Sequence, residues 1–366
     1  MKGAFMLENK EHFHGSDLEK IEEIYGIKKE DIISFSANVN PLGVSPRLRQ
    51  ELASHIDAIT SYPDREYTNL RKTIGEYCNA SYENILVGNG CTELISLFIQ
   101  LISPKHTLLL GPTYSEYERE LELVHSNINY YFLKEEDDFE LKVSDFCEHI
   151  KEKDLVIICN PNNPTSSALS HEKMRMILDF CQKNNTFVMV DETYVEFAPD
   201  VEAISCVTFL SEYHNLIILR GTSKFFAAPG LRLGYALTGN AEMITEINTH
   251  KNPWMINSLA EVAGITMFLD KDYIHESRKL AETERKRLTQ IFRDSGKYKV
   301  YPSFGNFILL KILDPQVTSS MLFDKAIKRG LMIRDCSTFP TLSDRYIRMC
   351  FMNPTDNDKL VKVLTE

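Results

Sequence analysis

Short apolar runs alternate with amphipathic stretches over the first two-thirds of the chain. The stretches, such as 93–102 and 171–183, carry apolar residues at helical spacing. The runs between them are apolar on both faces, which is typical of parallel strands covered by helices on both sides. They fall at 85–87, 107–110, 155–159, 187–190, 216–219 and 235–237. The pattern therefore predicts an α/β fold built on a mainly parallel sheet.

The pattern changes after about residue 257. A long charged helical stretch at 272–294 leads into 298–313, which is expected to form strands around Pro302 and Gly305. A helix at 319–330 and strands at 331–334 and 346–350 complete a small α+β unit. The N-terminal segment, helical over 18–25, is expected to pack against that unit. We therefore predict an N-terminal segment (1–45), a large domain (46–270) and a small C-terminal domain (271–366).

Composition and charge exclude several classes of function. Of the 366 residues 43% are apolar and 25% charged, as in ordinary globular proteins. The net charge of −11, with no basic patch, argues against a nucleic-acid surface. The most apolar run, 94–102, is too short to span a bilayer, which takes about 20 residues. The eight cysteines form no Cys-x-x-Cys pair, so we expect reduced thiols, no metal site and a cytoplasmic protein.

One charged run is expected to have no role. The four acidic residues 135–138 are consecutive and lie between two predicted elements. Such a run is most often a solvated loop.

Polar segments follow the predicted strands where each strand ends. Asn163 lies in Asn-Pro-Asn-Asn-Pro-Thr after the run 155–159, and Asp191 directly follows 187–190. Lys224, preceded by Ser223, comes after 216–219. Open α/β sheets build their sites at the carboxyl ends of the strands. These side chains are therefore expected to meet at one edge of the sheet.

The residue types at this edge match the chemistry of pyridoxal 5′-phosphate (PLP). A lysine amine, here Lys224, can bind the cofactor covalently and then move protons. An ionised carboxylate, here Asp191, can stabilise a proton on the ring nitrogen. Asn163 and Tyr194 can bond the phenolic oxygen, and Tyr114 can stack on the ring.

A phosphate group needs a cation and backbone N–H groups at the start of a helix. Gly90 and Cys91, in Gly-Asn-Gly-Cys-Thr just before the helical stretch 93–102, supply the N–H groups. Arg232 supplies the cation and Ser223 a hydroxyl.

Nearly the whole chain resembles the histidinol-phosphate aminotransferase branch of the fold-type I PLP enzymes. Within that branch it is most similar to the L-threonine-O-3-phosphate decarboxylases. The resemblance implies an aspartate aminotransferase-like fold, with a mainly parallel seven-stranded sheet in the large domain and a smaller α+β domain. The segments that carry it are His14-Gly15, 35–43, 62–64, 225–235, Pro253-Trp254 with Asn257, 333–336 and 345–348.

The resemblance also implies roles for residues outside the strand ends. Arg348 would clamp a substrate α-carboxylate, assisted by Asn38 and Asn163. Arg334 and His14 would bind a substrate phosphate.

By the same resemblance the enzyme is a homodimer with shared active sites. Tyr62, with Tyr67 as a second choice, would reach the cofactor phosphate of the neighbouring subunit.

Two reactions remain open at this stage. One is α-decarboxylation of O-phospho-L-threonine, a step of the cobalamin side-chain pathway. The other is transamination of histidinol phosphate or another amine that bears a phosphate or phosphonate. The same residues serve both, because the bond that breaks at Cα depends on a rotation about one bond. A transcription regulator with a PLP domain is disfavoured, since the residues before Phe35 are too few and too acidic for a winged helix.

Four departures from the family pattern leave the substrate open. Tyr194 is a tyrosine typical of the aminotransferases, where decarboxylase relatives can carry phenylalanine, and the turn Phe304-Gly305-Asn306 lacks an arginine that can occur there in the decarboxylases. Ser166 replaces the usual glycine after Asn-Pro-Thr. Gly221 stands where a hydroxyl residue often helps to hold the cofactor phosphate.

Overall fold

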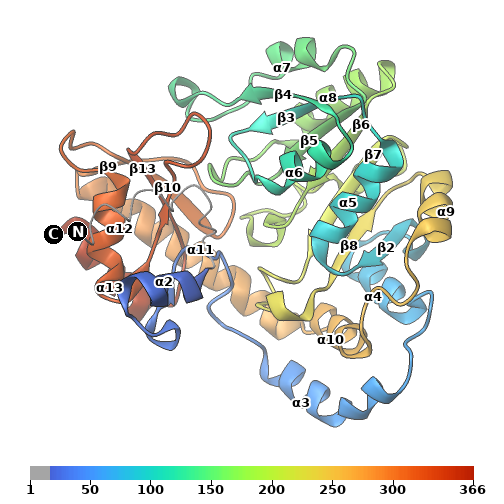
Figure 1. The fold of residues 1–366 in the computed structure, drawn as a ribbon, viewed down its shortest axis with the longest axis horizontal. Coiled ribbons are helices and arrows are strands. Elements are labelled where there is room, and N and C mark those ends of the chain that lie inside the picture. The colour runs from blue at the N-terminus through green and yellow to red at the C-terminus, as the bar shows by residue number, and fades with distance from the viewer. Residues whose placement is uncertain (1–16) are drawn as a thin grey trace.

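A seven-stranded sheet forms the centre of the larger part of the molecule (Figure 1). The structure, a computed structural model, describes residues 17–366. The strand order is β2-β8-β7-β6-β5-β3-β4, and β8 alone runs antiparallel to its neighbours. The predicted α/β fold with a mainly parallel sheet is confirmed. The strands are β2 (Ile85–Gly88), β3 (His106–Gly111), β4 (Asn127–Phe132), β5 (Leu155–Cys159), β6 (Phe187–Asp191), β7 (Leu216–Gly221) and β8 (Gly234–Leu237).

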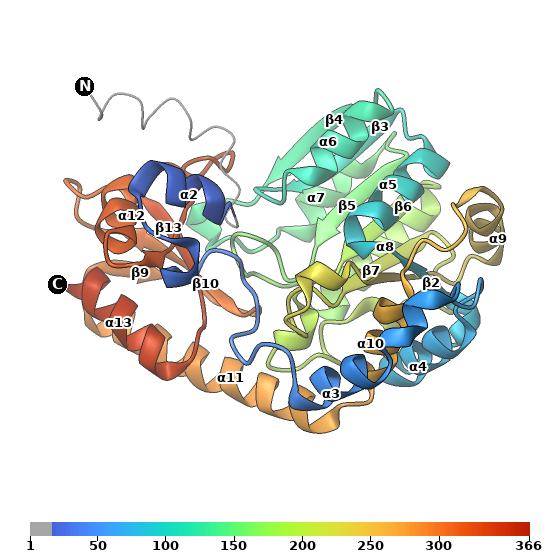
Figure 2. The same ribbon diagram turned by 60° about the horizontal axis from the view of Figure 1, so that its bottom comes forward.

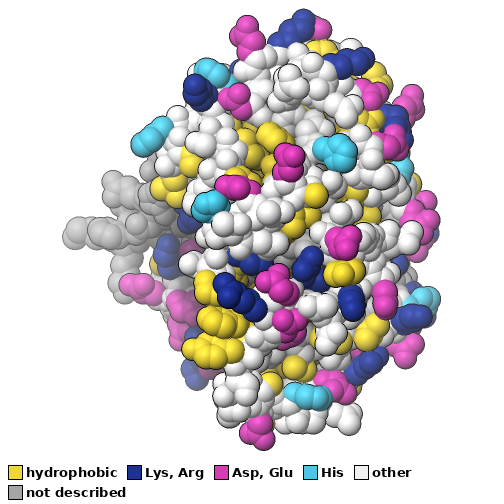
Figure 3. All heavy atoms as spheres, turned by 90° about the vertical axis from the view of Figure 1, so that its right-hand side faces the viewer, with side chains coloured by type: hydrophobic (Ala, Val, Ile, Leu, Met, Phe, Trp, Pro, Cys, Tyr) yellow, Lys and Arg dark blue, Asp and Glu magenta, His cyan; other side chains and the backbone are white. Residues whose placement is uncertain are grey.

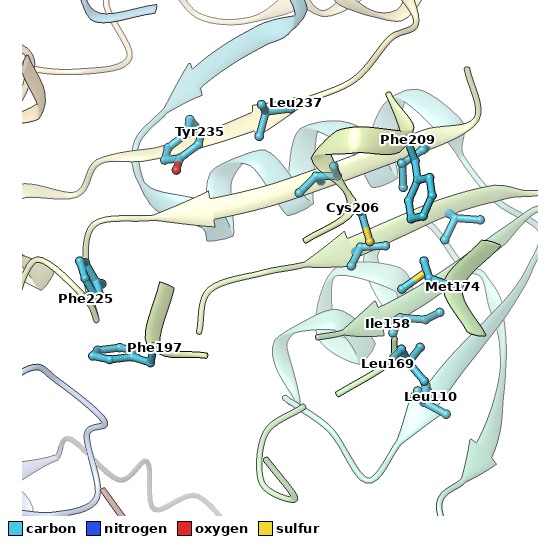
Figure 4. Close-up of a cluster of buried hydrophobic side chains, with 14 of the residues drawn as sticks. Leu110, Ile158, Leu169, Met174, Phe197, Cys206, Phe209, Phe225, Tyr235 and Leu237 are labelled. Atoms are coloured by element: carbon cyan, nitrogen blue, oxygen red, sulfur yellow. The ribbon is translucent and has the colours of Figure 1, made fainter. Parts of the chain in front are cut away.

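Alternate residues of the central strands enter two separate cores, because successive side chains of a strand point to opposite faces. Side chains at the even-numbered positions of β3, β5, β6 and β7, such as Ile158, form the first core. They pack against α4 (Thr68–Cys78), α7 (Val143–Ile150), α8 (His171–Lys183) and α10 (Ser258–Phe268). Figure 4 shows part of this core, with Met174 of α8 close to Ile158. Ile157 and the odd-numbered positions pack against α5 (Gly90–Ile102), α6 (Glu116–Leu123) and α9 (Ala241–His250). Both faces of the sheet are therefore covered by helices.

The carboxyl ends of six strands lie at one edge of this sheet. Parallel pairing puts the ends of β3, β5, β6 and β7 together, with Cys159 opposite Asp191 in register. The neighbours of β8 are both antiparallel to it, so β2 ends at the same edge. The strand that sequence reasoning did not find is β4, which pairs with β3 at the rim of the sheet. Its exposed residues Asn127 and Asn129 interrupt the apolar pattern.

A second unit is built on a four-stranded antiparallel sheet in the order β12-β13-β10-β9. Its core also takes in Ile21 of α2 (Leu18–Tyr25), and the Tyr25 hydroxyl donates to Asp324 at 2.7 Å. Figure 2 shows α11 (Lys271–Asp294) running from this unit toward α10. The other elements of this second unit are β9 (Tyr298–Val300), β10 (Phe307–Ile312), α12 (Ser319–Ile327), β12 (Arg334–Asp335), β13 (Tyr346–Cys350) and α13 (Pro354–Thr365).

The prediction of a single strand at 331–334 is wrong. The chain instead forms two short strands in different sheets. β11 (Leu331–Met332) pairs in parallel with β1 (Ile33–Ser34), whereas β12 pairs with β13. Near the other end of the described chain, α3 (Pro46–Ser54) packs on α10 of the large unit. The segment 33–54 therefore passes from one unit to the other, and the predicted domain limits stay a proposal.

The acidic run 135–138 is not merely solvated. Glu135 pairs with Lys311 of β10 at 2.6 Å and accepts a hydrogen bond from the Tyr301 hydroxyl at 3.0 Å. Asp138 pairs with Lys299 of β9 at 2.7 Å. The expectation of a solvated loop was wrong because these lysines lie more than 150 positions away in sequence. The run links the two units.

Within residues 17–366, no helix is both long enough and apolar enough to cross a membrane. On the face shown in Figure 3, acidic and basic side chains are interspersed over the surface.

Candidate active site

A cavity of about 630 Å³ lies at the carboxyl edge of the large sheet and extends to the small unit. Because the loops after β3, β5, β6 and β7 all leave from this edge, their side chains converge there. The cavity brings together most of the residues predicted from the sequence. They are Asn38, Cys91, Tyr114, Asn163, Asp191, Tyr194, Ser223, Lys224, Arg232, Arg334 and Arg348.

Lys224 follows β7 and points its amine across the cavity. Its Nζ atom donates to the backbone oxygen of Ala37 at 2.7 Å, and its own carbonyl accepts from the Asn40 N–H at 3.0 Å. Burial lowers the pKa of the Lys224 amine to about 8, and the positive charges of Arg348 and Arg232 act in the same direction. About a tenth of this amine is therefore neutral, and nucleophilic, at pH 7, far more than for an ordinary lysine.

Asp191 ends β6 and is buried, with both carboxylate oxygens hydrogen-bonded. Thr193 donates to Oδ1 from its N–H at 2.9 Å and from its hydroxyl at 2.6 Å. The Tyr117 hydroxyl, from α6, donates to Oδ2 at 2.6 Å. Burial raises the pKa of the Asp191 carboxyl, while the hydrogen bonds from Thr193 and Tyr117 oppose the rise. The hydrogen bonds thus favour a buried but ionised carboxylate.

Tyr194 and Asn38 meet on the side of the cavity toward the small unit. Asn38 Nδ2 donates to the Tyr194 hydroxyl at 3.3 Å, and the Tyr194 ring packs edge-on against Phe307 at 4.9 Å. Burial raises the pKa of the Tyr194 phenol, so it remains a neutral donor. The other side-chain atom of Asn38, Oδ1, is buried and has no partner among the described residues.

Arg348, on β13, is a buried cation that forms no ion pair with a carboxylate of the described residues. It donates to Asn163 Oδ1 and, at 2.6 Å, to the backbone oxygen of Ser36. Its guanidinium also lies over the Phe307 ring, 5.2 Å from the centroid. Among residues 17–366 its hydrogen-bond acceptors are neutral, and its Nε is buried with no partner there. A buried charge in this state is costly unless an anion binds it.

The helix predicted to begin at residue 93 begins at Gly90. The residues Gly90, Cys91 and Thr92 form its first turn, where backbone N–H groups have no partner within the helix. Gly90 has a φ of +79°, and a Cβ there would collide with the Arg232 guanidinium. A Cβ at Gly234 would lie 2.6 Å from the Cys91 nitrogen. Because both positions are glycine, the first turn of α5 and the Arg232 guanidinium can lie against each other. Free N–H groups beside a positive charge form a suitable binding site for an anion.

Arg334, on β12, lies at the outer part of the cavity. It donates to the Thr338 hydroxyl at 3.1 Å and stacks over the Phe339 ring at 5.2 Å. Burial, then the charge of Arg348, lowers the pKa of Arg334. On the opposite wall the Tyr114 ring is held edge-on by Tyr117 at 5.6 Å.

Two tyrosines that were expected to reach a neighbouring subunit do not line the cavity of their own chain. Tyr62 is 79% exposed and packs on Trp254 with 4.5 Å between ring centroids. Tyr67 is buried in its own chain, where its hydroxyl donates to the Ile256 carbonyl at 2.9 Å. His14 lies outside the described residues.

Residues 30–364 match the family model described as aminotransferase class I and II. The chain belongs to this family. The family and the resemblance drawn from the motifs therefore agree, and the chain is an enzyme of the PLP-dependent decarboxylase or aminotransferase kind.

Relatives of both kinds are found. A protein of Caldanaerobacter subterraneus subsp. tengcongensis named "Putative threonine-phosphate decarboxylase" is 34% identical, over 90% of this chain and 88% of its own length. The crystal structure of the histidinol-phosphate aminotransferase from Clostridium acetobutylicum is 32% identical with a TM-score of 0.84, over 90% of this chain and 97% of that one. The histidinol-phosphate aminotransferase from Sinorhizobium meliloti in complex with PLP shares the fold, at 22% identity and a TM-score of 0.84, over 95% of this chain and 93% of that one.

Sequence reasoning missed several residues that shape the cavity. The Asp-x-Thr spacing could have indicated Thr193, since a threonine two residues after an aspartate often donates to it. Tyr117 and the carbonyl of Ala37 reach the site only through the tertiary fold, so no local signal marks them. Ser36 and Thr113 line the cavity with buried hydroxyls that have no partner among the described residues.

Proposed function

We propose that this enzyme uses PLP bound at Lys224 to remove the α-carboxylate of a phosphorylated amino acid, with O-phospho-L-threonine as the first candidate. The observation that carries the proposal is that a nucleophilic amine and a buried cation share one cavity. Lys224 and Arg348 both line it, and Arg348 is buried with neutral acceptors, among the described residues, around its guanidinium. A substrate carboxylate would satisfy that charge.

The residues present fit PLP. The first turn of α5 and Arg232 would hold the cofactor phosphate, with Ser223 nearby. Asp191 would hold the ring nitrogen, Tyr114 would stack on the ring, and Asn163 and Tyr194 would bond the phenolic oxygen. The unpartnered atoms Asn38 Oδ1 and Thr113 Oγ1 also face this cavity and call for polar partners. When bound, PLP supplies an electron-accepting ring that weakens the bonds at the substrate Cα.

Lys224 would act twice. As a neutral amine it would hold the cofactor, and once the substrate amine is bound it would be free to move a proton. Arg348 holds the carboxylate so that the bond between Cα and the carboxylate is the one that breaks. Carbon dioxide would leave without the electron pair of the broken bond, and the protonated Lys224 amine, or water, would return a proton to Cα.

Arg334 would bind the substrate phosphate, because its guanidinium lies in the same cavity on the side of the small unit. Burial makes a charged group there costly, and a dianionic phosphate would offset that cost. His14 is proposed for the same role on the resemblance alone.

A second candidate is transamination of histidinol phosphate or a related amine. The similarity to the Clostridium acetobutylicum enzyme and the hydroxyl of Tyr194 both favour it. The same residues would serve, with Lys224 moving the Cα proton instead.

We further propose a homodimer whose sites are shared. The exposed Tyr62 ring, supported by Trp254, is available to reach a neighbouring subunit's cofactor phosphate. The exposed side chains of Ile56 and Ile59, in η3 (Ile56–Thr60), lie just before it in sequence and would be covered by the same contact.

The test is turnover of O-phospho-L-threonine by the PLP-loaded enzyme with carbon dioxide trapped. The proposal predicts carbon dioxide release over many turnovers. Transamination would leave the amino group on the enzyme in one equivalent, with no carbon dioxide, and would replace the decarboxylase proposal with the second candidate.

A further inference from the structure

The carboxylate of Asp191 uses its two oxygens unequally. Oδ1 accepts two hydrogen bonds, both from Thr193. Oδ2 accepts one, from Tyr117 at 2.6 Å. A carboxylate oxygen has room for about two such bonds. Oδ1 is therefore saturated, and Oδ2 keeps one free lone pair.

Tyr117 is well placed to fix the direction of that lone pair. Its side chain is fully buried on the first turn of α6, and its ring packs edge-on against Tyr114 at 5.6 Å. Because the ring cannot move without disturbing the packing between α6 and the sheet, its hydroxyl is a fixed donor. Nothing else in the described residues bonds Oδ2.

We propose that Tyr117 is a positioning residue that holds Asp191 with one lone pair of Oδ2 free for the ring nitrogen of the cofactor, and that keeps the shared proton on that nitrogen. The inference rests on the proposed function, since it presumes PLP in this cavity. A donor to the ionised carboxylate makes Asp191 a weaker base. The proton then stays on the ring, where it makes the ring an electron acceptor.

The groups around Asp191 come from several elements. Its own chain neighbour Glu192 adds a negative charge that raises the pKa of Asp191. The other titratable groups that face it are Cys91 on α5, Cys159 on β5, Tyr114 before α6 and Tyr194 after β6. Burial raises the pKa of each of these four groups, so all are neutral near pH 7. Tyr117 and Thr193 are therefore the groups that offset the burial of Asp191.

The experiment is Tyr117→Phe, loaded with PLP that carries a magnetic nitrogen isotope in its ring. Nuclear magnetic resonance then reports where the proton lies. Loss of one hydrogen bond to a charged group shifts the balance toward protonated Asp191 by about tenfold or more. We expect the ring-nitrogen signal at neutral pH to move toward that of an unprotonated pyridine, and kcat to fall with little change in KM.

A matched control is Tyr131→Phe. The Tyr131 hydroxyl also donates to an aspartate, Asp145 at 2.8 Å, and it is also buried, but it does not line the cavity. Its loss should leave the ring-nitrogen signal and kcat unchanged. A ring-fluorinated tyrosine at position 117, which keeps both the ring and the donor, should retain the protonated signal even if the phenylalanine variant folds poorly.

Two failures are distinguishable. If the wild-type protein takes up no PLP, the proposed function falls. If the wild type binds PLP and the folded Tyr117→Phe variant keeps the wild-type ring-nitrogen signal, only the role of Tyr117 is overturned, and its contact with Asp191 is structural.

Discussion

A Cβ atom on Gly221 would lie 2.8 Å from the Sγ atom of Cys91. The end of β7 and the first turn of α5 therefore fit each other only while one of the two positions is small. Family members often carry a hydroxyl residue where this chain has Gly221. The Cys91 side chain takes up the space that such a residue would need.

This pairing predicts a compensating change. Gly221→Ser alone should weaken PLP binding about tenfold or more, because its side chain displaces Cys91 and the helix start. Combining it with Cys91→Ala should restore most of the affinity, since the colliding sulfur is gone. Titration of the cofactor-free proteins with PLP measures both. Additive effects in the double variant would show that the two positions do not compete.

The Lys224 amine gives a pH dependence with a defined sign. Its pKa is about 8 in the folded protein and about 10.4 in an unfolded chain. Between these values the unfolded chain binds more protons, so stability of the cofactor-free protein should rise with pH, by up to about 3 kcal/mol. The rate of covalent PLP capture should rise through about pH 8 as well.

Unfolding curves from pH 7 to about 10.5 test the stability part. Lys224→Met should lose this rise, whereas Lys279→Met, which removes an exposed helical lysine, should keep it. Equal slopes in both variants would contradict the assignment of the low pKa to Lys224.

Arg348→Gln should separate the two candidate reactions. It removes the cation but retains a polar side chain, so kcat/KM for O-phospho-L-threonine should fall about 10²-fold while PLP affinity stays within twofold. Histidinol phosphate has no carboxylate, so a single turnover with it should be little affected. Arg345→Gln is the control, because it lies close to Arg348 in the sequence while its guanidinium donates, within the described residues, to backbone oxygens of the small unit. An equal loss in both variants would argue against a carboxylate clamp.

The environment of Ser166 predicts that its glycine variant is more stable than its alanine variant. It has a φ of +60°, which favours glycine, yet its hydroxyl accepts from the N–H groups of Gly305 at 2.9 Å and Phe304 at 3.2 Å. Ser166→Ala should cost about 1–3 kcal/mol, because it keeps the strained backbone and leaves the buried N–H of Gly305 without its acceptor, whereas the N–H of Phe304 keeps the Ser166 backbone oxygen at 2.9 Å. Ser166→Gly should cost about 1 kcal/mol less, since it relieves the strain. Urea unfolding measures both, and an alanine variant as stable as the wild type would contradict the role of the hydroxyl.

The sequence predicted the sheet because its central strands are buried on both faces and read as continuous apolar runs. It also predicted which residues meet, since strand ends share one edge of a parallel sheet. It missed β4, where pairing at the rim leaves Asn127 and Asn129 exposed. It missed Tyr117 and the partners of Glu135 because those contacts depend on how distant elements pack.

The most direct test of the account is to identify the residue that binds the cofactor. The PLP-loaded protein is reduced with borohydride, digested, and the modified peptide is located by mass spectrometry. The account predicts one cofactor per chain, attached to Lys224, with no modification in Lys224→Ala and loss of its turnover. Attachment to a different lysine, or activity that survives the substitution, would contradict it.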